Sequence, residues 1–352
     1  MSLLSSSSTP SGKKLASPIV KSEQQSVDYY FDSYSHSGIH EEMLKDTVRT
    51  KTYRDAIIKN PQLFRGKIVL DVGCGTGILS MFAAQAGAAH VYGIDASNII
   101  DSAQQIIEEN GFKQKITLIR GKVEEITLPV EKVDIIISEW MGYCLLYENM
   151  LETVLIARDK WLKPDGILLP DKARMFICAI EDGDYRRSKI NFWDHVYGFR
   201  MSCLKKEALR EPLVDVCEPQ QVSTNVCQMI SFDLEKVSVP ELSVSVPYSV
   251  KASRFDKIHG MLVFFDVLFS HGSSVFTMST SPMKRPTHWK QTVFYMPVPM
   301  SIEPNETISG QFSMTPNPRN KRDMDIEISF NHKRGFGPGA PTESQSMKYK
   351  LR

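Results

Sequence analysis

Two glutamates in an apolar segment are the side chains of this sequence that most clearly suggest chemistry. Glu139 and Glu148 lie in SEWMGYCLLYENM, residues 138–150, and most of the residues between them are large and apolar. Carboxylates are seldom buried without a partner, and two that share an apolar pocket repel each other. One of them should therefore have a raised pKa unless a cation lies between them. A hairpin that carries two solvated acids is the alternative.

A guanidinium is the cation that suits such a pair, because it is planar, permanently charged and carries donors on several edges. Two carboxylates could hold it in a fixed plane and concentrate its positive charge on one nitrogen. Another nitrogen would then keep lone-pair density toward a methyl donor, and positioning of this kind supplies much of a reaction rate. The segment therefore indicates a site that binds and orients an arginine side chain.

A glycine-rich turn upstream of the glutamates predicts a cofactor site. The segment VLDVGCGTG places Gly73, Gly75 and Gly77 between a predicted strand and a predicted helix, where backbone amides can bind an anionic or polar group. Its spacing is G-x-G-x-G, which differs from the dinucleotide pattern G-x-G-x-x-G. Asp71 precedes the turn, and a carboxylate suits a neighbouring amino group better than a pyrophosphate. The pattern favours S-adenosylmethionine over a dinucleotide.

Three further side chains could contact that cofactor. Asp95 ends the next predicted strand, where an acid can accept hydrogen bonds from both ribose hydroxyls. Glu124 could receive the adenine amino group, and Arg49 could pair with the methionine carboxylate. Taken alone, Glu124 and Arg49 are each better explained as surface charges. A dinucleotide-dependent oxidoreductase is therefore the alternative from another enzyme class.

The elements that must position these residues alternate between strands and helices. This alternation predicts a parallel, doubly wound, Rossmann-like sheet. Ligands bind at the carboxyl ends of such strands, so Glu139, which follows the fourth strand, should face the cofactor crevice. Strands are predicted at residues 67–73, 90–96, 115–121, 132–140 and from 167, and helices at 27–60, 77–88, 98–111 and 148–166.

Composition divides the chain into three parts. Residues 1–27 are rich in Ser, Lys and Pro and are predicted to be disordered, because they have too few apolar groups to offset the entropy of ordering. Residues 28–170 form the N-terminal helices and the cofactor domain. Residues 171–352 contain short, partly alternating strands separated by turns, which predict a β-barrel-like domain. Within it, residues 183–215 are expected to be helical or irregular.

Bulk properties exclude several classes of partner. The chain has 352 residues and a net charge of +1, so we expect no direct binding of nucleic acid. No apolar run approaches the roughly 20 residues that a membrane span needs, so we expect no membrane partner. The six cysteines show no metal-ligand spacing, and we predict no metal and a reducing compartment.

Four separated segments resemble those of the protein arginine methyltransferases, in the family's order and closest to its type I branch. The segment SEWMGYCLLYENM resembles the double-glutamate hairpin, and VLDVGCGTG resembles the cofactor loop. YFDSYSHSGIHEEMLKDTVRT, residues 30–50, resembles the helices that cover the cofactor. THWKQTVFY, residues 287–295, resembles the Thr-His-Trp loop. The resemblance extends from about Tyr29 to about Phe330.

This resemblance implies roles for individual residues. Glu139 and Glu148 would bind and polarise the substrate guanidinium, and His288, paired with Asp46, would take part in proton removal. A structural loop histidine is the alternative for His288. The resemblance also implies that S-adenosylmethionine is held by His40, Arg49, Asp71, Gly73, Gly75, Asp95, Glu124 and Met150, and that Tyr34, Met43, Tyr143 and Trp289 line the substrate pocket.

The implied activity is transfer of methyl groups from S-adenosylmethionine to arginine nitrogens of proteins, with S-adenosylhomocysteine as the product. Met43 and Met150 resemble the pair that makes room for a second methyl on the same nitrogen, although core packing would also explain them. The expected products are monomethyl and asymmetric dimethyl arginine. Monomethyl or symmetric dimethyl products, and a non-catalytic scaffold, are the alternatives. One departure is Asp95, where the type I branch usually carries Glu.

The resemblance also implies partners and a location in the cell. The expected substrates are Arg-Gly-rich RNA-binding proteins and histones. Residues 183–215 resemble a dimerisation arm, which predicts a homodimer or a higher homo-oligomer. We expect the protein in the cytoplasm and the nucleus.

Overall fold

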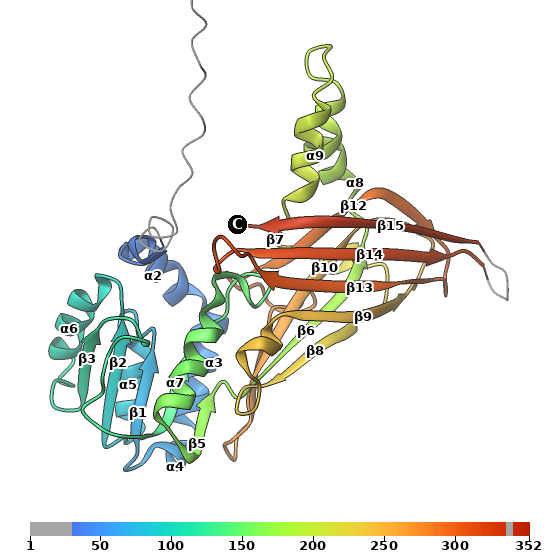
Figure 1. Cartoon of the computed structure of the whole chain (residues 1–352). Coiled ribbons are helices and arrows are strands. Elements are labelled where there is room, and N and C mark those ends of the chain that lie inside the picture. The colour runs from blue at the N-terminus through green and yellow to red at the C-terminus, as the bar shows by residue number, and fades with distance from the viewer. Residues whose placement is uncertain (1–29, 336–340) are drawn as a thin grey trace, which may run out of the picture.

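The structure, a computed structural model, describes residues 30–335 and 341–352 (Figure 1). The disorder predicted for residues 1–27 lies outside the described residues. The chain builds a sheet covered by helices and then a larger antiparallel β structure beside it. Figure 1 shows the first part in blue and green and the second in yellow to red.

The first part is a parallel sheet with the strand order β3-β2-β1-β4-β5. Its central strands are apolar and almost wholly buried, as strands covered on both faces must be. The order reverses between β1 and β4, so a crevice opens at their carboxyl ends. The doubly wound, Rossmann-like prediction is confirmed. The strands are β1 (Ile68–Val72), β2 (His90–Asp95), β3 (Ile116–Arg120), β4 (Val133–Ser138) and β5 (Leu162–Leu169).

Helices connect these strands and precede them in the chain. The predicted single or double helix at residues 27–60 is instead divided by a break at Asp46 and another break before Ser37, with a helical turn at 30–33. The remaining helices follow the predicted alternation. They are α2 (Ser37–Lys45), α3 (Thr47–Ile58), α4 (Pro61–Phe64), α5 (Ile78–Gln85), α6 (Ile99–Glu109) and α7 (Met150–Trp161).

One predicted boundary in this part is wrong. The helix expected at 148–166 ends at Trp161, and strand β5 begins at Leu162. Pro164 explains the difference, because it has no N–H to donate within a helix and disfavours helical geometry at the residue before it.

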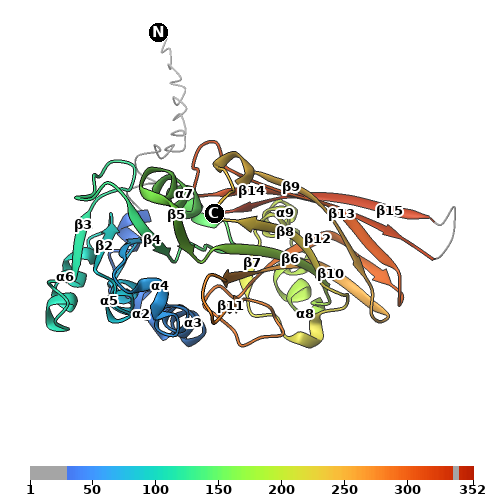
Figure 2. The same ribbon diagram turned by 90° about the horizontal axis from the view of Figure 1, so that it is seen from below.

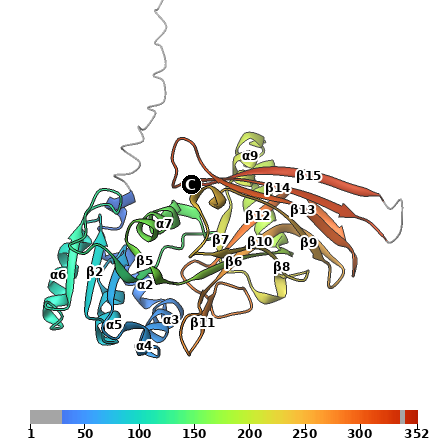
Figure 3. The same ribbon diagram turned by 60° about the horizontal axis from the view of Figure 1, so that its bottom comes forward.

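The second part is made of two antiparallel sheets. One has the order β7-β12-β10-β6-β8 with β11 beside β10, and the other has the order β15-β14-β13-β9. Figures 2 and 3 show the second sheet lying across the first. The ring of Phe294 packs edge-on against Phe312 and Tyr349 of the facing sheet, with centroids 6.2 and 5.1 Å away. The barrel-like prediction is confirmed.

The described end of the chain, residues 341–352, adds strand β15 to the second sheet. The strands are β6 (Lys172–Ile180), β7 (Leu213–Asp215), β8 (Cys227–Asp233), β9 (Val244–Lys251), β10 (Asp256–Phe269), β11 (Phe276–Ser279), β12 (Gln291–Ile302), β13 (Thr307–Pro316), β14 (Met324–Lys333) and β15 (Thr342–Leu351).

A helical arm projects from the second part (Figure 1). It contains α8 (Gly183–Tyr185), irregular helical turns and α9 (Ser202–Arg210). Tyr197 and Phe199 at its tip are 97% and 71% exposed, so the arm presents aromatic surface that no described part of the chain covers. The last residues of the predicted segment differ, because they form β7 and pair with β12.

Helix α3 joins the two parts at both of its ends. After its last turn, the side-chain amide of Asn60 donates a hydrogen bond to the backbone oxygen of Ser274 at 2.9 Å. The Asn60 oxygen accepts one from the Ser274 N–H at 3.0 Å. Midway, the ring of Tyr53 packs edge-on against Phe269 of β10. At its first turn, Asp46 contacts His288. The helix therefore fixes the spacing between the cofactor domain and the barrel.

Candidate active site

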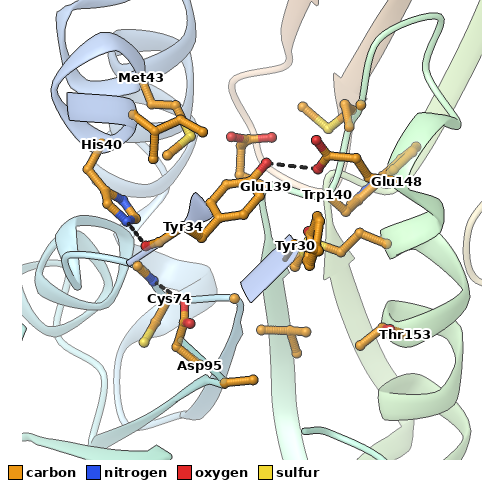
Figure 4. Close-up of a pocket in the computed structure, with 18 of the residues that line it drawn as sticks. Tyr30, Tyr34, His40, Met43, Cys74, Asp95, Glu139, Trp140, Glu148 and Thr153 are labelled. Atoms are coloured by element: carbon orange, nitrogen blue, oxygen red, sulfur yellow. Dashed lines mark hydrogen bonds between the residues drawn. The ribbon is translucent and has the colours of Figure 1, made fainter. Parts of the chain in front are cut away.

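A cavity of about 390 Å³ opens at the carboxyl ends of β1, β2 and β4. Its walls come from both parts of the chain: the helical turn at 30–33, helix α2, the glycine turn, residues 139–150, the loop before β12, and Arg322. Figure 4 shows Glu139, Glu148, Tyr34 and His40 pointing toward the same space.

The glycine turn forms the floor of the cavity. Gly73, Gly75 and Gly77 all have positive φ, which other residues rarely adopt. A Cβ added at Gly73 would lie 2.3 Å from the Met150 side chain, and one at Gly75 would lie 3.2 Å from the His40 ring. The side chains of Met150 and His40 thus pack closely against the turn. Its backbone reaches the cavity at Gly73 and Gly75 because glycine has no Cβ to fill this space.

Asp95 lies beside this turn and already accepts several hydrogen bonds. Its Oδ2 accepts one from the Gly75 N–H at 2.9 Å (Figure 4), and its Oδ1 accepts bonds from the N–H and hydroxyl of Ser97. The short Asp side chain therefore holds the turn while it also lines the cavity. Glu124 lies farther along the wall and accepts a bond from Thr153 Oγ1 at 3.2 Å.

Asp71 is not where the sequence placed it. We expected it beside the cofactor, but it lies beneath the turn, fully buried and outside the cavity wall. Its Oδ2 accepts a hydrogen bond from the Ser80 hydroxyl at 2.7 Å, whereas its Oδ1 is buried with no partner among the described residues. Burial raises the pKa of Asp71 to about 7. The residue supports the turn from inside the protein.

The segment that joins the two glutamates is a tight hairpin. Gly142 and Leu145 form a β-bridge, and a Cβ at Gly142 would lie 1.9 Å from the Tyr147 backbone oxygen. Backbone strain is concentrated here. Positive φ occurs at Cys144, Leu145, Glu148 and Asn149. The buried apolar residues between the glutamates anchor this strained turn and so bring Glu148 back toward Glu139.

Glu139 is paired with Arg49. Nε of Arg49 lies 2.8 Å from Oε2 of Glu139, and the two side chains are 7% and 8% exposed. The Arg49 guanidinium also donates to the backbone oxygen of Met43 at 3.2 Å. The sequence assigned Arg49 to the cofactor carboxylate, and the structure adds a contact with a glutamate that sequence reasoning missed.

Glu148 is held by Tyr34. The Tyr34 hydroxyl donates a hydrogen bond to Oε2 of Glu148 at 2.8 Å (Figure 4). Burial raises the pKa of Glu148, the negative charge of Glu139 raises it further, and the Tyr34 hydrogen bond and the charge of Arg322 oppose the shift. This agrees with the expectation that one of two neighbouring carboxylates has a raised pKa.

His288 and Asp46 form a second polar pair. Nδ1 of His288 lies 2.8 Å from Oδ2 of Asp46, and the His288 N–H donates to the same oxygen at 2.9 Å. Asp46 also caps helix α3 by accepting a bond from the Arg49 N–H. Burial opposes ionisation of Asp46, but these bonds outweigh it and lower its pKa. The neighbouring Trp289 donates to the Met141 oxygen at 2.8 Å.

Most of the predicted site residues meet at this cavity. Asp46 is not on the cavity wall but contacts two residues that are, His288 and Arg49, and Asp71 also lies outside the wall. The sequence missed Arg322 because its position in the chain gives no sign that it approaches the glutamates, and it also missed Tyr30. The predicted residues on the wall are Tyr34, His40, Met43, Arg49, Gly73, Gly75, Asp95, Glu124, Glu139, Tyr143, Glu148, Met150, His288 and Trp289.

None of the helices described is long and apolar enough to span a membrane. In residues 30–335 and 341–352, no cluster of three His, Cys, Asp or Glu side chains is arranged to hold a metal ion.

Family models match both parts of the chain. A methyltransferase domain matches residues 69–166, and the arginine methyltransferase oligomerization subdomain matches residues 171–335. The second match means that the arm and the barrel together correspond to an oligomerization subdomain.

Known proteins match over nearly the whole chain. Protein arginine N-methyltransferase 1 of Chlamydomonas reinhardtii is 53% identical over 95% of this chain and 96% of its own length. The protein of the same name from Schizosaccharomyces pombe is 54% identical over 92% of this chain and 95% of its own. A structure of the Trypanosoma brucei PRMT1 enzyme–prozyme heterotetrameric complex with AdoHcy has a TM-score of 0.87 at 46% identity, covering 91% of this chain and 100% of that chain. Arabidopsis thaliana protein arginine methyltransferase 10 has a TM-score of 0.82 at 32% identity, covering 92% of this chain and 100% of that chain. The sequence resemblance is thereby confirmed: the chain belongs to the protein arginine methyltransferase family, a family of S-adenosylmethionine-dependent enzymes.

Proposed function

We propose that this chain methylates arginine side chains of proteins and that its products are monomethyl and asymmetric dimethyl arginine. The observation that carries the proposal is the arrangement of Glu139 and Glu148 on one buried wall, each with one oxygen already held by a neighbour. Two carboxyl groups at fixed positions on one wall are suited to a planar cation with several donors.

The residues present fit S-adenosylmethionine. The glycine turn leaves its backbone open to the cavity, and a Cβ at Gly73 would collide with Met150. Asp95 and Glu124 supply acceptors for hydroxyl and amino groups, and Arg49 and His40 supply donors along the same wall. When bound, the cofactor supplies an electrophilic methyl group on a sulfonium.

The two glutamates act on the substrate guanidinium. Arg49 fixes Glu139 and Tyr34 fixes Glu148, so neither carboxylate must reorganise when the substrate enters. Both acids attract positive charge toward the nitrogens they contact and leave electron density on the nitrogen to be methylated. Burial excludes water, which strengthens these interactions.

His288 provides a place for the proton that the methylated nitrogen loses. Because Nδ1 faces the Asp46 carboxylate, Nε2 is the ring nitrogen that is left to accept a proton. Asp46 orients the ring through its contact with Nδ1 and accepts a second bond from the His288 backbone N–H. This division of roles matches the general pattern of a histidine base oriented by a carboxylate.

The product geometry follows from Met43 and Met150. Both side chains line the cavity. A flexible thioether leaves room beside a monomethylated nitrogen that a larger, stiffer side chain would fill. Asymmetric dimethylation is therefore favoured over symmetric dimethylation.

The remaining assignments are proposals about the cell. We propose Arg-Gly-rich proteins and histones as substrates, since a pocket with two acids suits cationic segments. The match to an oligomerization subdomain, together with the exposed aromatics of the arm, supports a homodimer. We also propose that the protein acts in the cytoplasm and the nucleus.

Product analysis tests the enzymatic proposal. The purified protein is incubated with S-adenosylmethionine and an Arg-Gly-rich peptide, and the three methylarginines are quantified by mass spectrometry after hydrolysis. We expect monomethyl arginine first and asymmetric dimethyl arginine later. Symmetric product would contradict the role of Met43 and Met150, and the absence of any methylarginine would contradict the proposed function.

A further inference from the structure

Arg322 connects the barrel to the catalytic hairpin. It lies in the loop between β13 and β14 and lines the cavity. Its Nη1 donates a hydrogen bond to the Glu148 backbone oxygen at 2.8 Å. Its own backbone oxygen accepts one from the Glu148 N–H, also at 2.8 Å. One bond is made to each of the two peptide groups that flank the Glu148 Cα, so together they fix the backbone on both sides of this residue.

This backbone needs such support. Glu148 has a φ of 70°, a conformation that residues other than glycine rarely adopt. Strained residues persist only when their surroundings hold them in place. The next residue, Asn149, has positive φ as well, so the hydrogen bonds from the barrel act on a strained part of the hairpin.

The same guanidinium also contacts the segment that covers the cavity. Its Cζ lies 3.5 Å from the centroid of the Tyr30 ring and 5.2 Å from that of Phe31. These rings precede Tyr34, whose hydroxyl donates to the Glu148 carboxylate. One side chain therefore contacts both the backbone of Glu148 and the segment that supplies a hydrogen bond to its carboxylate.

The loop that carries Arg322 is itself ordered by internal hydrogen bonds. Oδ1 of Asn317 accepts bonds from the N–H groups of Arg319 and Asn320 at 2.9 and 3.2 Å. The Asn317 N–H donates to the Asp323 oxygen at 2.8 Å, which closes the loop. Because the loop is closed in this way, Arg322 reaches the cavity from a defined position.

The charge of Arg322 acts on the same residue. Burial favours the protonated form of Glu148, and a protonated carboxyl group is a poorer acceptor for a guanidinium. The positive charge of Arg322 favours the ionised form. Arg322 and Tyr34 thus both favour the ionised form of Glu148, whereas burial and the charge of Glu139 disfavour it.

We propose that Arg322 is a positioning residue for methyl transfer: from the barrel it holds Glu148 and the covering segment at Tyr30 and Phe31 in one arrangement and keeps Glu148 ready to bind the substrate guanidinium. The inference rests on the proposed function of the site. It also assigns a role to the barrel inside the reaction, beyond its role in oligomerization.

The test compares Arg322→Met, Arg322→Lys and the control Arg319→Met, an exposed arginine of the same loop. Methionine keeps an unbranched apolar stem but removes the guanidinium and its charge, whereas lysine keeps the charge but cannot cover a ring with a flat guanidinium. Steady-state kcat and KM for an Arg-Gly-rich peptide are measured between pH 6 and 9, and thermal unfolding is measured with S-adenosylhomocysteine.

We expect Arg322→Met to lower kcat by roughly tenfold or more, because a misplaced acid loses orientation. It should also move the acidic limb of the kcat/KM profile upward by about one pH unit, since a nearby cation is removed. Arg322→Lys should lower kcat and leave the acidic limb in place. Arg319→Met should behave as the wild type.

Three outcomes would overturn the inference. The first is a wild-type kcat in Arg322→Lys, which decides the matter even if Arg322→Met fails to fold. The second is a wild-type rate and pH profile in Arg322→Met, and the third is an equal loss in both variants without any change in pH profile. Failure of the wild type to form methylarginine would instead contradict the proposed function, so the two failures are distinguishable.

Discussion

The Nε of Arg49 lies 2.8 Å from Oε2 of Glu139, in a pair whose side chains are almost wholly buried. A protein guanidinium thus already binds one of the two acids that we assign to a substrate guanidinium. The ion pair fixes the Glu139 carboxylate in the wall of the cavity, between the residues that we assign to the cofactor and those that we assign to the substrate. It follows that Glu139 should be sensitive to loss of charge even when its shape is kept.

Replacing Glu139 with Gln tests this dependence. The amide oxygen can still accept the Arg49 hydrogen bond, so we expect the fold and cofactor binding to persist. Loss of the negative charge should lower kcat by about 10²–10³-fold, the range seen when one preorganised electrostatic group is removed. Methylarginine formation and S-adenosylhomocysteine binding are measured on the same preparation. The exposed Glu125→Gln is the control, and equal kcat in both variants would contradict the assignment.

Asp46 has two structural roles that substitution can separate. It caps helix α3 and accepts two bonds from His288. Asparagine is as good a cap as aspartate, whereas alanine costs about 0.5–2 kcal/mol of stability. Asp46→Asn should therefore unfold near the wild-type temperature but lose kcat, because an amide beside the His288 ring lacks the negative charge of the carboxylate. Asp46→Ala should lower both the unfolding temperature and kcat. An Asn variant with full activity would show that the carboxylate does not assist His288.

Asn60 should contribute strongly to the stability of the fold although it lies outside the cavity. It is 2% exposed and makes hydrogen bonds to both backbone groups of Ser274 and to the Ala56 oxygen. Asn60→Ala leaves buried polar groups without partners, which costs about 1–3 kcal/mol per group. We expect about 2–4 kcal/mol of lost stability in urea unfolding, together with a lower kcat because α3 positions Asp46 and Arg49. The exposed Lys51→Ala, on helix α3 itself, should change stability by less than about 0.5 kcal/mol. Equal effects at both positions would argue against the connection.

The raised pKa of Asp71 predicts that the unfolding free energy depends on pH. Its pKa is raised to about 7 in the folded state from an ordinary value of 3.8, so the folded protein binds this proton more tightly than the unfolded chain. Its contribution is fully favourable below pH 4 and is lost as the pH rises to about 7, by up to about 1.4 kcal/mol per pH unit. Asp71→Asn removes this titration.

The measurement is the unfolding free energy of wild type and Asp71→Asn at pH 5 and pH 7.5. The variant should gain stability relative to the wild type as the pH rises between these values. The exposed Asp165→Asn serves as control and should show no such trend. A constant difference between Asp71→Asn and the wild type would mean that Asp71 does not carry the raised pKa.

The sequence predicts the local elements of this fold better than it predicts distant contacts. The glycine turn, the strand before Glu139 and the helix after Met150 follow from hydrophobic periodicity and turn residues, which act over a few positions. The end of α7 was missed because a single proline outweighed an otherwise helical pattern. The burial of Asp71 was missed because a residue's place above or below a turn depends on how the helix packs onto it.

The contacts that complete the site were the least predictable. Arg322 reaches Glu148 across 174 positions, and Arg49 reaches Glu139 across 90. Periodicity carries no information about such pairs. His288 was assigned only because its motif resembled that of a family, and the structure supplied its bond to Asp46.

The contact between Arg322 and Glu148 has a consequence for the order in which cofactor binding and methylation activity arise during synthesis. Domains generally fold as units while the chain emerges, with the N-terminal one first. Residues up to 169 complete the sheet and the glycine turn, whereas His288 and Arg322 are made much later. A nascent chain should therefore bind cofactor well before it can methylate anything, and methylation begins only once the loop after β13 has docked against Glu148.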